Sequence, residues 1–164
     1  AKRRTRRPAP PEDYEDPLSN YDPPDYADEL ERSLAEDQVH DMNVWLAAQV
    51  TPEATVAETL KLMVDCDIAC VLIVQRDRLE GIFSERDVLT RLADDFDRLR
   101  DRPIREVMTP NPVCVYDSDS PAKAINLMAT GGFRHVPVLD VDDRVVGILG
   151  PRRVTAFLDE HFQD

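Results

Sequence analysis

Apolar and polar positions follow the same order twice along the chain. In the first pass, an amphipathic helical pattern ends near Asp65, and a run of branched apolar residues covers 68–74. A polar stretch at 75–80 separates this run from a second apolar run that begins at Gly81, and a helical pattern resumes at Val88. The pattern predicts helix, strand, hairpin loop, strand and helix, in that order.

The second half repeats this order at a nearly constant offset. Leu60 and Ile125 occupy matching places in the helical stretches, and Gly81 and Gly147 occupy matching places in the return strands, where the offset is larger by a single residue. An offset that stays nearly constant indicates a tandem duplication. The expected elements are a strand at 113–116, a turn at 118–121, a helix at 122–129, a strand at 133–139, a hairpin at 141–144, a strand at 145–149 and a helix at 154–162.

Capping signals mark the ends of two predicted helices. Thr55 and Glu58 have the spacing of a capping box at the start of the first helix. Gly131 and Gly132 suit the C-terminal cap of the corresponding helix in the second half. These signals support the helix positions independently of the apolar pattern.

The segment 1–24 carries basic side chains, then carboxylates and prolines, without any apolar period. Such a segment buries too little apolar surface to offset its ordering entropy, so we expect it to be disordered. Leu30 and Leu34, one helical turn apart, allow a short acidic helix after it. The expected division is a tail at 1–24, an acidic helix or linker at 25–40, a first repeat at 41–100 and a second repeat at 101–164.

The composition narrows the class of protein. The 164 residues carry a formal net charge of −13, which opposes a general affinity for nucleic acid. No apolar run approaches the roughly 20 residues that span a bilayer, so we expect a cytoplasmic protein without a membrane segment. Cys66, Cys70 and Cys114 lie among apolar residues without C-x-x-C spacing, and we expect reduced thiols in or near the core.

Four motifs occur in a fixed order along the duplicated chain. They are Thr55 to Met63, Gly81 to Asp87, Val107 to Pro112 and Arg134 to Val138. Together they resemble a tandem pair of cystathionine-β-synthase (CBS) domains, often called a Bateman module. The resemblance implies an α+β fold in which two β-α-β-β-α repeats pack sheet to sheet with pseudo-twofold symmetry. It also implies clefts that bind AMP, ADP, ATP or S-adenosylmethionine, and pairing of modules into a homodimer.

Ser84 and Asp87 occupy the turn between the first return strand and the following helix. A carboxylate there can accept hydrogen bonds from both ribose hydroxyls, each worth about 1.5–3 kcal/mol, and the serine hydroxyl adds a further polar group. The same spacing is also an ordinary helix-capping pattern that needs no ligand. The resemblance favours a nucleotide site over a cap alone, and it places Ile82 beside the adenine.

The second repeat lacks this ribose acceptor. Gly150 and Pro151 are suited to start its last helix, but Arg153 stands where the family has an aspartate. We therefore expect that the second cleft does not hold a ribose in the usual way. Arg152 or Arg153 is a candidate for further phosphate contacts, since a guanidinium matches phosphate geometry.

Basic side chains have the opposite distribution. Arg134 and His135 precede a strand of the second repeat, where the first repeat has Ala69 and Cys70. The resemblance implies that such residues reach the phosphates of a ligand whose ribose is held by the other repeat, so we expect one composite site built on Asp87. The alternative is that Arg134 pairs with a surface carboxylate and that His135 is a satisfied interior histidine.

Binding is favoured over catalysis. The three histidines have no nucleophile at a recognisable spacing, and the sequence has no Gly-rich phosphate loop and no metal-ligand spacing. We expect a regulatory adenine-nucleotide sensor without enzyme activity or a required cofactor, with one functional cleft per chain and an unidentified regulated protein. The alternative is a ligand-free dimerisation or scaffold module that interacts through its tail. Nucleic-acid binding through the Arg-rich arm is a less favoured third hypothesis.

Overall fold

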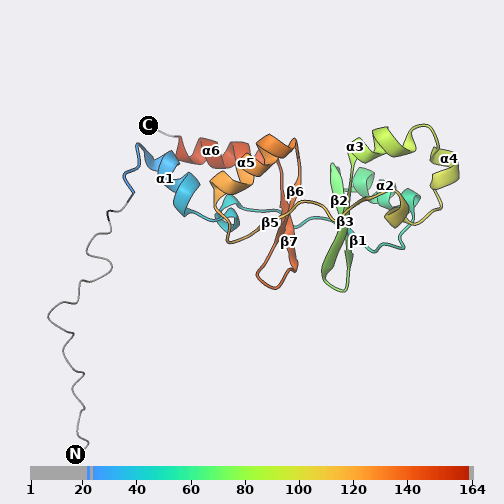
Figure 1. Ribbon diagram of the computed structural model, residues 1–164. Helices are drawn as coiled ribbons and strands as arrows, with labels where there is room; N and C mark the ends of the chain where they lie inside the picture. Colours follow the sequence, from blue (N-terminus) through green and yellow to red (C-terminus); the bar gives the residue numbers. More distant parts are fainter. Residues whose placement is uncertain (1–21, 23, 163–164) are drawn as a thin grey trace, which may run out of the picture.

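The computed structural model describes residue 22 and residues 24–162, and Figure 1 shows its two halves side by side. The disorder that we expect over 1–24 falls almost wholly outside the described residues. The expected α+β architecture with a duplicated order of elements is confirmed.

The sheet of the first half has four strands in the order β1-β2-β3-β4. These strands are β1 (Gln49–Val50), β2 (Cys70–Gln75), β3 (Arg78–Ser84) and β4 (Thr109–Pro110). β1 is parallel to β2, and the other pairs are antiparallel. α2 (Val56–Asp65) connects β1 to β2, and it begins with the expected capping box, in which the Thr55 amide donates to Glu58 Oε2 at 2.8 Å.

The sheet of the second half has the strands β5 (Val115–Tyr116), β6 (Val136–Leu139) and β7 (Val145–Leu149) in sequence order. α5 (Pro121–Gly131) precedes β6, and α6 (Pro151–His161) follows β7. Gly132 ends α5 with a φ of +67°, a left-handed conformation that favours glycine. The two sheets lie next to each other in the middle of the molecule, with the β2-β3 and β6-β7 hairpins pointing the same way (Figure 1).

Two elements predicted for the first half differ from the structure in detail. The polar stretch at 75–80 is not a loop, because β3 already begins at Arg78 and only Arg76 and Asp77 form the turn. Both turn residues have positive φ, which matches the right-handed twist of a tight hairpin. After β3 the chain is helical from Val88 as expected, but α3 (Glu85–Asp87) already begins before it, Val88–Leu92 forms a π-helical turn, and a separate short helix α4 (Phe96–Leu99) follows.

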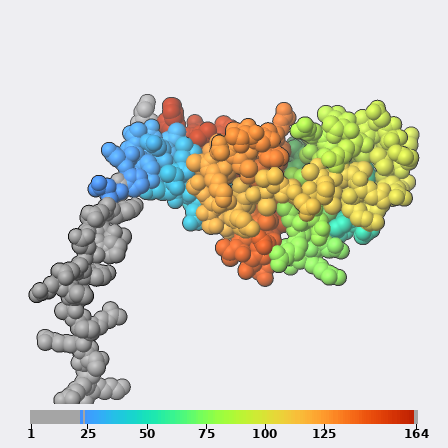
Figure 2. Space-filling view, in the orientation of Figure 1, coloured from blue at the N-terminus to red at the C-terminus, as the bar shows by residue number. Residues whose placement is uncertain are grey.

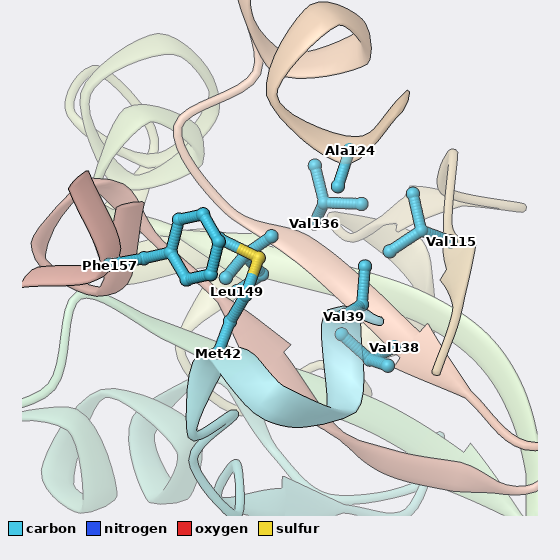
Figure 3. Close-up of a cluster of buried hydrophobic side chains, with 8 residues drawn as sticks. All are labelled: Val39, Met42, Val115, Ala124, Val136, Val138, Leu149 and Phe157. Carbon is cyan, nitrogen blue, oxygen red and sulfur yellow. The ribbon is translucent and has the colours of Figure 1, made fainter. Parts of the chain in front are cut away.

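The segment that precedes each repeat packs into the opposite half. Val39 and Met42, in a 3-10 turn at Val39–Met42, belong to the buried core of the second half, together with Phe157 and Leu149 (Figure 3). Ile104 and Val107 join the core of the first half in the same way. The two halves therefore exchange equivalent pieces of chain.

Backbone hydrogen bonds show that this exchange follows the duplication. The Val39 amide donates to the Asp119 carbonyl at 2.8 Å, and the Ile104 amide donates to the Ala54 carbonyl at 2.7 Å. The two donors are separated by the same offset as the two acceptors, and this offset is the one that relates the matching helical stretches. The two bonds are thus copies of each other across the pseudo-twofold axis.

The acidic helix expected within 25–40 is part of this exchange. α1 (Glu29–Glu36) packs against α5 and α6, and its Leu34 contacts the core of the second half. Leu99 of α4, at the equivalent place in the duplication, makes the matching contact in the first half. α1 is therefore the counterpart of α4.

The cysteines differ in exposure. All three are free, Cys70 is buried, and burial raises the pKa of its thiol to about 12. Cys114 is partly buried, whereas Cys66 is exposed because it follows the last turn of α2. The expectation of core or near-core thiols is therefore wrong for Cys66.

The exchange predicts that Met42 stabilises the second half. Replacing this buried side chain with alanine removes contacts and leaves a cavity, so Met42→Ala should lower the free energy of unfolding by about 2–5 kcal/mol. Leu46→Ala is the control, because this side chain is 89% exposed, and it should change the free energy of unfolding by about 0.5 kcal/mol or less. Urea unfolding monitored by circular dichroism measures both, and similar values for the two variants would contradict the packing.

Candidate functional site

A cavity of about 830 Å³ lies between the two halves. The end of β3, the α3 turn and β4 supply one wall, and the residues from Gly132 to His135 supply the other. In Figure 2 the orange surface of the second half adjoins the green surface of the first half. The structure thus brings together at this cavity five of the six predicted site residues, namely Ile82, Ser84, Asp87, Arg134 and His135.

Asp87 is held at this cavity by the turn that follows β3. Its Oδ2 accepts hydrogen bonds from the Ser84 amide and the Ser84 hydroxyl, both at 2.9 Å. The helix-capping contact is therefore present, and the residue is only 6% exposed. The cap and the cavity use the same carboxylate, so capping does not remove Asp87 from the site.

Thr109 and Arg91 also line the cavity, although they were not among the predicted site residues. The Thr109 hydroxyl donates to Asp87 Oδ1 at 3.1 Å, and Arg91 Nε lies 3.5 Å from the same oxygen. Arg91 Nη1 further donates to the carbonyls of Val107 and Met108, at 2.8 and 2.6 Å. The helical spacing of Asp87 and Arg91 is a signal for their pairing, but no local pattern predicts the contact with Thr109.

Arg134 and His135 lie on the opposite wall. Within the described residues Arg134 is exposed and has no side-chain hydrogen bond or ion pair, so the predicted alternative of a surface carboxylate partner is not seen. His135 is half-buried, and its burial lowers the pKa of the imidazole, a shift that the carboxylate of Glu85 opposes and that Arg134 reinforces. The wall therefore offers one free guanidinium and one imidazole that favours its neutral form.

Two further charged side chains come from the α3 turn. Glu85 and Arg86 stand between Ser84 and Asp87 in sequence and line the same cavity. Arg86 has no side-chain partner among the described residues. Their place in the short turn between Ser84 and Asp87 is the sequence signal that could have predicted these two residues.

Arg153 lies apart from these residues. Its guanidinium carbon stands 4.3 Å from the centre of the Trp45 ring, a cation–π contact, and its buried Nε has no hydrogen-bond partner among the described residues. Trp45 precedes β1 and pairs with Ile148 of β7, where the Ile148 amide donates to the Trp45 carbonyl at 2.9 Å. Arg153 occupies the position in the second half that is equivalent to Asp87, and its side chain is engaged with Trp45.

The CBS domain family matches two segments of the chain, residues 47–94 and 104–160. The chain belongs to the CBS domain family. A CBS domain-containing protein of Arabidopsis thaliana, CBSCBSPB1, is 31% identical over 107 residues, which are 65% of this chain and 20% of that protein. This chain therefore spans about a fifth of the length of that relative.

Solved structures of CBS proteins have the same fold. A CBS domain protein from Pyrobaculum aerophilum, complexed with AMP, is 25% identical with a TM-score of 0.66 and covers 75% of this chain and 96% of its own. CBSX2 from Arabidopsis thaliana, also in complex with AMP, is 26% identical with a TM-score of 0.63 and covers 75% of this chain and 96% of its own. The CBS cavity of this chain can thus be compared with modules that bind an adenine nucleotide.

The CBS cavity has the polar groups that a nucleotide needs. Two carboxylates and three hydroxyls lie on the wall of the first half, and a guanidinium and an imidazole lie on the wall of the second. Within the described residues, no group of three or more His, Cys, Asp or Glu side chains could hold a metal ion. No helix in the described part of the chain is long and apolar enough to cross a membrane.

The lowered pKa of His135 predicts a pH effect on stability. Between this pKa and the ordinary value near 6.5, the unfolded chain binds more protons at this residue than the folded chain, so acidification favours unfolding. The free energy of unfolding of the wild type should therefore fall relative to that of His135→Gln between about pH 7 and 5. Denaturant titrations at several pH values measure the difference, with His40→Gln, at an exposed surface histidine, as the control. Parallel profiles for the wild type and His135→Gln would contradict this effect.

Proposed function

We propose that this chain is a regulatory CBS module that binds an adenine nucleotide in one cleft and transmits the occupancy of that cleft to a partner protein. The observation that carries the proposal is the composite cavity, in which Asp87 of one half faces Arg134 and His135 of the other. In a nucleotide the phosphate is attached to the 5′ oxygen of the ribose, away from the edge that carries the free ribose hydroxyls, so an acceptor for these hydroxyls and a cation for the phosphate on opposite walls suit such a ligand.

The wall of the first half suits the ribose. Asp87 is an ionisable acceptor in a mostly buried position, where a charge-assisted hydrogen bond to a sugar hydroxyl contributes more than it does at a surface. Ile82, in the adjacent strand, lines the same cavity and offers an apolar surface for the adenine. Both features support an adenosyl group as the bound moiety.

The opposite wall suits the phosphate. Arg134 has no competing carboxylate partner within the described residues, so its guanidinium is available for an anion. Arg86 provides a second available guanidinium on the facing turn. The two AMP complexes of CBS proteins support AMP as the first ligand to test, while ADP, ATP and S-adenosylmethionine belong to the same proposal.

The residues of the second cleft support the binding of one nucleotide per chain. There a guanidinium, that of Arg153, replaces the carboxylate of Asp87 and lies over Trp45. A ribose would find no acceptor on this side chain, which carries only donors. The contribution of Arg153 to the nucleotide site stays a prediction. The contact of this side chain with Trp45 does not favour such a contribution.

Asp87→Asn tests the ribose acceptor while keeping an oxygen that can cap Ser84. AMP at about 100 times its Kd should stabilise the wild type by about 2.7 kcal/mol, which corresponds to a rise in Tm of about 5 °C or more. The variant should need at least about tenfold more AMP for the same shift, because the amide loses a charge-assisted acceptor. Thermal unfolding measures both effects.

Asp41→Asn is the matched control for this variant. Asp41 Oδ2 accepts from the Gln38 amide at 2.9 Å, with the same spacing as Asp87 and Ser84, but Asp41 is exposed and does not line the cavity. Its AMP-induced shift should equal that of the wild type. The proposal is wrong if the wild type shows no shift with AMP, ADP, ATP or S-adenosylmethionine at millimolar concentrations.

Arg134→Ala tests the phosphate contact. The variant should bind AMP about tenfold more weakly, because a charged hydrogen bond is lost, but it should bind adenosine as the wild type does. Isothermal titration calorimetry gives these affinities and should show one AMP per chain for the wild type. Equal losses for AMP and adenosine, or two equivalent sites per chain, would count against this assignment.

Assembly and location are further parts of the proposal. The family resemblance implies pairing into a homodimer through the CBS repeats, and the composition favours a cytoplasmic location. Action on a separate regulated protein completes the proposal. The molecular mass in solution tests the first of these. If no adenosyl ligand binds, a structural module that acts through pairing becomes the better description of the chain.

A further inference from the structure

The carboxylate of Asp87 is already nearly saturated with hydrogen bonds from the protein. An ionised carboxylate has about four acceptor sites, two on each oxygen. Oδ2 uses both of its sites for the amide and the hydroxyl of Ser84. Oδ1 accepts from the Thr109 hydroxyl at 3.1 Å and faces Arg91 Nε at 3.5 Å. A ribose that donates two hydroxyl groups must therefore displace at least one of these donors.

Of the two residues that donate hydrogen bonds to the carboxylate, Ser84 and Thr109, Thr109 is the easier to displace. The bonds from Ser84 form the cap of the α3 turn, and their loss would leave a backbone amide without a partner. The Thr109 hydroxyl turns about a single bond and can find another acceptor or water. Its bond to Oδ1 is also longer than either bond from Ser84. A ligand hydroxyl should therefore take its place on Oδ1.

The bond from Thr109 also belongs to the connection between the two halves. Thr109 lies in β4, which has only two residues and pairs with β3 through Ile82 and Gly81. Arg91 holds the same connection through the carbonyls of Val107 and Met108, and its Nη2 donates to the Thr109 hydroxyl at 3.3 Å. The bond from Thr109 to Asp87 is therefore one of several polar contacts at β4, and it is the one that ties this short strand directly to the carboxylate in the cleft.

We propose that Thr109 couples the cleft to the connection between the halves: the ligand replaces its hydroxyl on Asp87 Oδ1, and β4 loosens as a result. This inference rests on the proposed function, because it requires a ligand with hydroxyl groups at Asp87. It names the element through which occupancy is transmitted. The change is an exchange of one hydrogen bond for another, which a ligand can drive only through its different affinity for the two arrangements.

Thr109→Val tests the inference by the sign of its effect on affinity. Valine has nearly the same shape as threonine but lacks the hydroxyl, so AMP no longer has to displace a donor. The variant should bind AMP about three- to tenfold more tightly than the wild type, in line with the net value of a single hydrogen bond. Thr109→Ser keeps the hydroxyl and should bind AMP as the wild type does. Isothermal titration calorimetry measures all three proteins, and their Tm values verify that each is folded.

Hydrogen–deuterium exchange supplies a second readout. The Asn111 amide, which donates to the Glu80 carbonyl at 3.1 Å, and the Met108 amide, which donates to the Ile104 carbonyl at 2.9 Å, report on the two ends of β4. Saturating AMP should increase exchange of peptides that contain these amides in the wild type. Thr109→Val should show increased exchange without AMP and little further change with it.

The outcomes separate the inference from the function on which it rests. If the wild type binds AMP but Thr109→Val binds it equally or more weakly, the inference is overturned and the nucleotide site remains. Protection of the same peptides by AMP in the wild type would also overturn it. If the wild type binds none of the adenosyl ligands, the proposed function fails, and the inference fails with it.

Discussion

The structure depends on short apolar segments that each precede one repeat in sequence and pack into the core of the other. Val39 and Met42 fill the core of the second half, and Ile104 and Val107 fill that of the first. Burial of such side chains contributes about 1.5–3 kcal/mol each, so neither core is complete without the segment that it receives. The first exchanged segment continues to Trp45, which bridges to β7, and the second continues to Thr109 in β4, which pairs with β3. The same packing therefore positions Trp45 and Thr109 at comparable places in the duplicated structure.

Sequence patterns correctly predicted the helix ends that are fixed by residues close to them in the sequence. The capping box at Thr55 and the glycine cap at Gly132 are of this kind. The β2-β3 hairpin was predicted with too long a loop, because two residues with positive φ look like part of a longer polar stretch. The helix from Val88 was predicted, but its π-helical form was not, because its apolar positions also suit a regular α-helix.

The candidate site shows the same limit. Ser84 and Asp87 are close neighbours in sequence, and their contact followed from local geometry, whereas the resemblance to CBS domains was needed to place Arg134 and His135 opposite them. The contact between Asp87 and Thr109 depends on how β4 returns to β3, which no periodicity encodes. The contact of Arg153 with Trp45 was likewise not predicted, because the two residues lie far apart in the sequence, and the contribution of Arg153 to the nucleotide site stays a prediction.

An exchange of equivalent segments has a consequence for the origin of the molecule. A single ancestral repeat would have lacked one piece of its own core and would have obtained it from a second copy, as in a domain-swapped dimer. Joining two such copies in one chain then required only a connection, and every contact of the dimer was kept. Once the copies were joined, their two clefts were free to diverge. One now carries the aspartate, and the other carries the arginine that lies on a tryptophan.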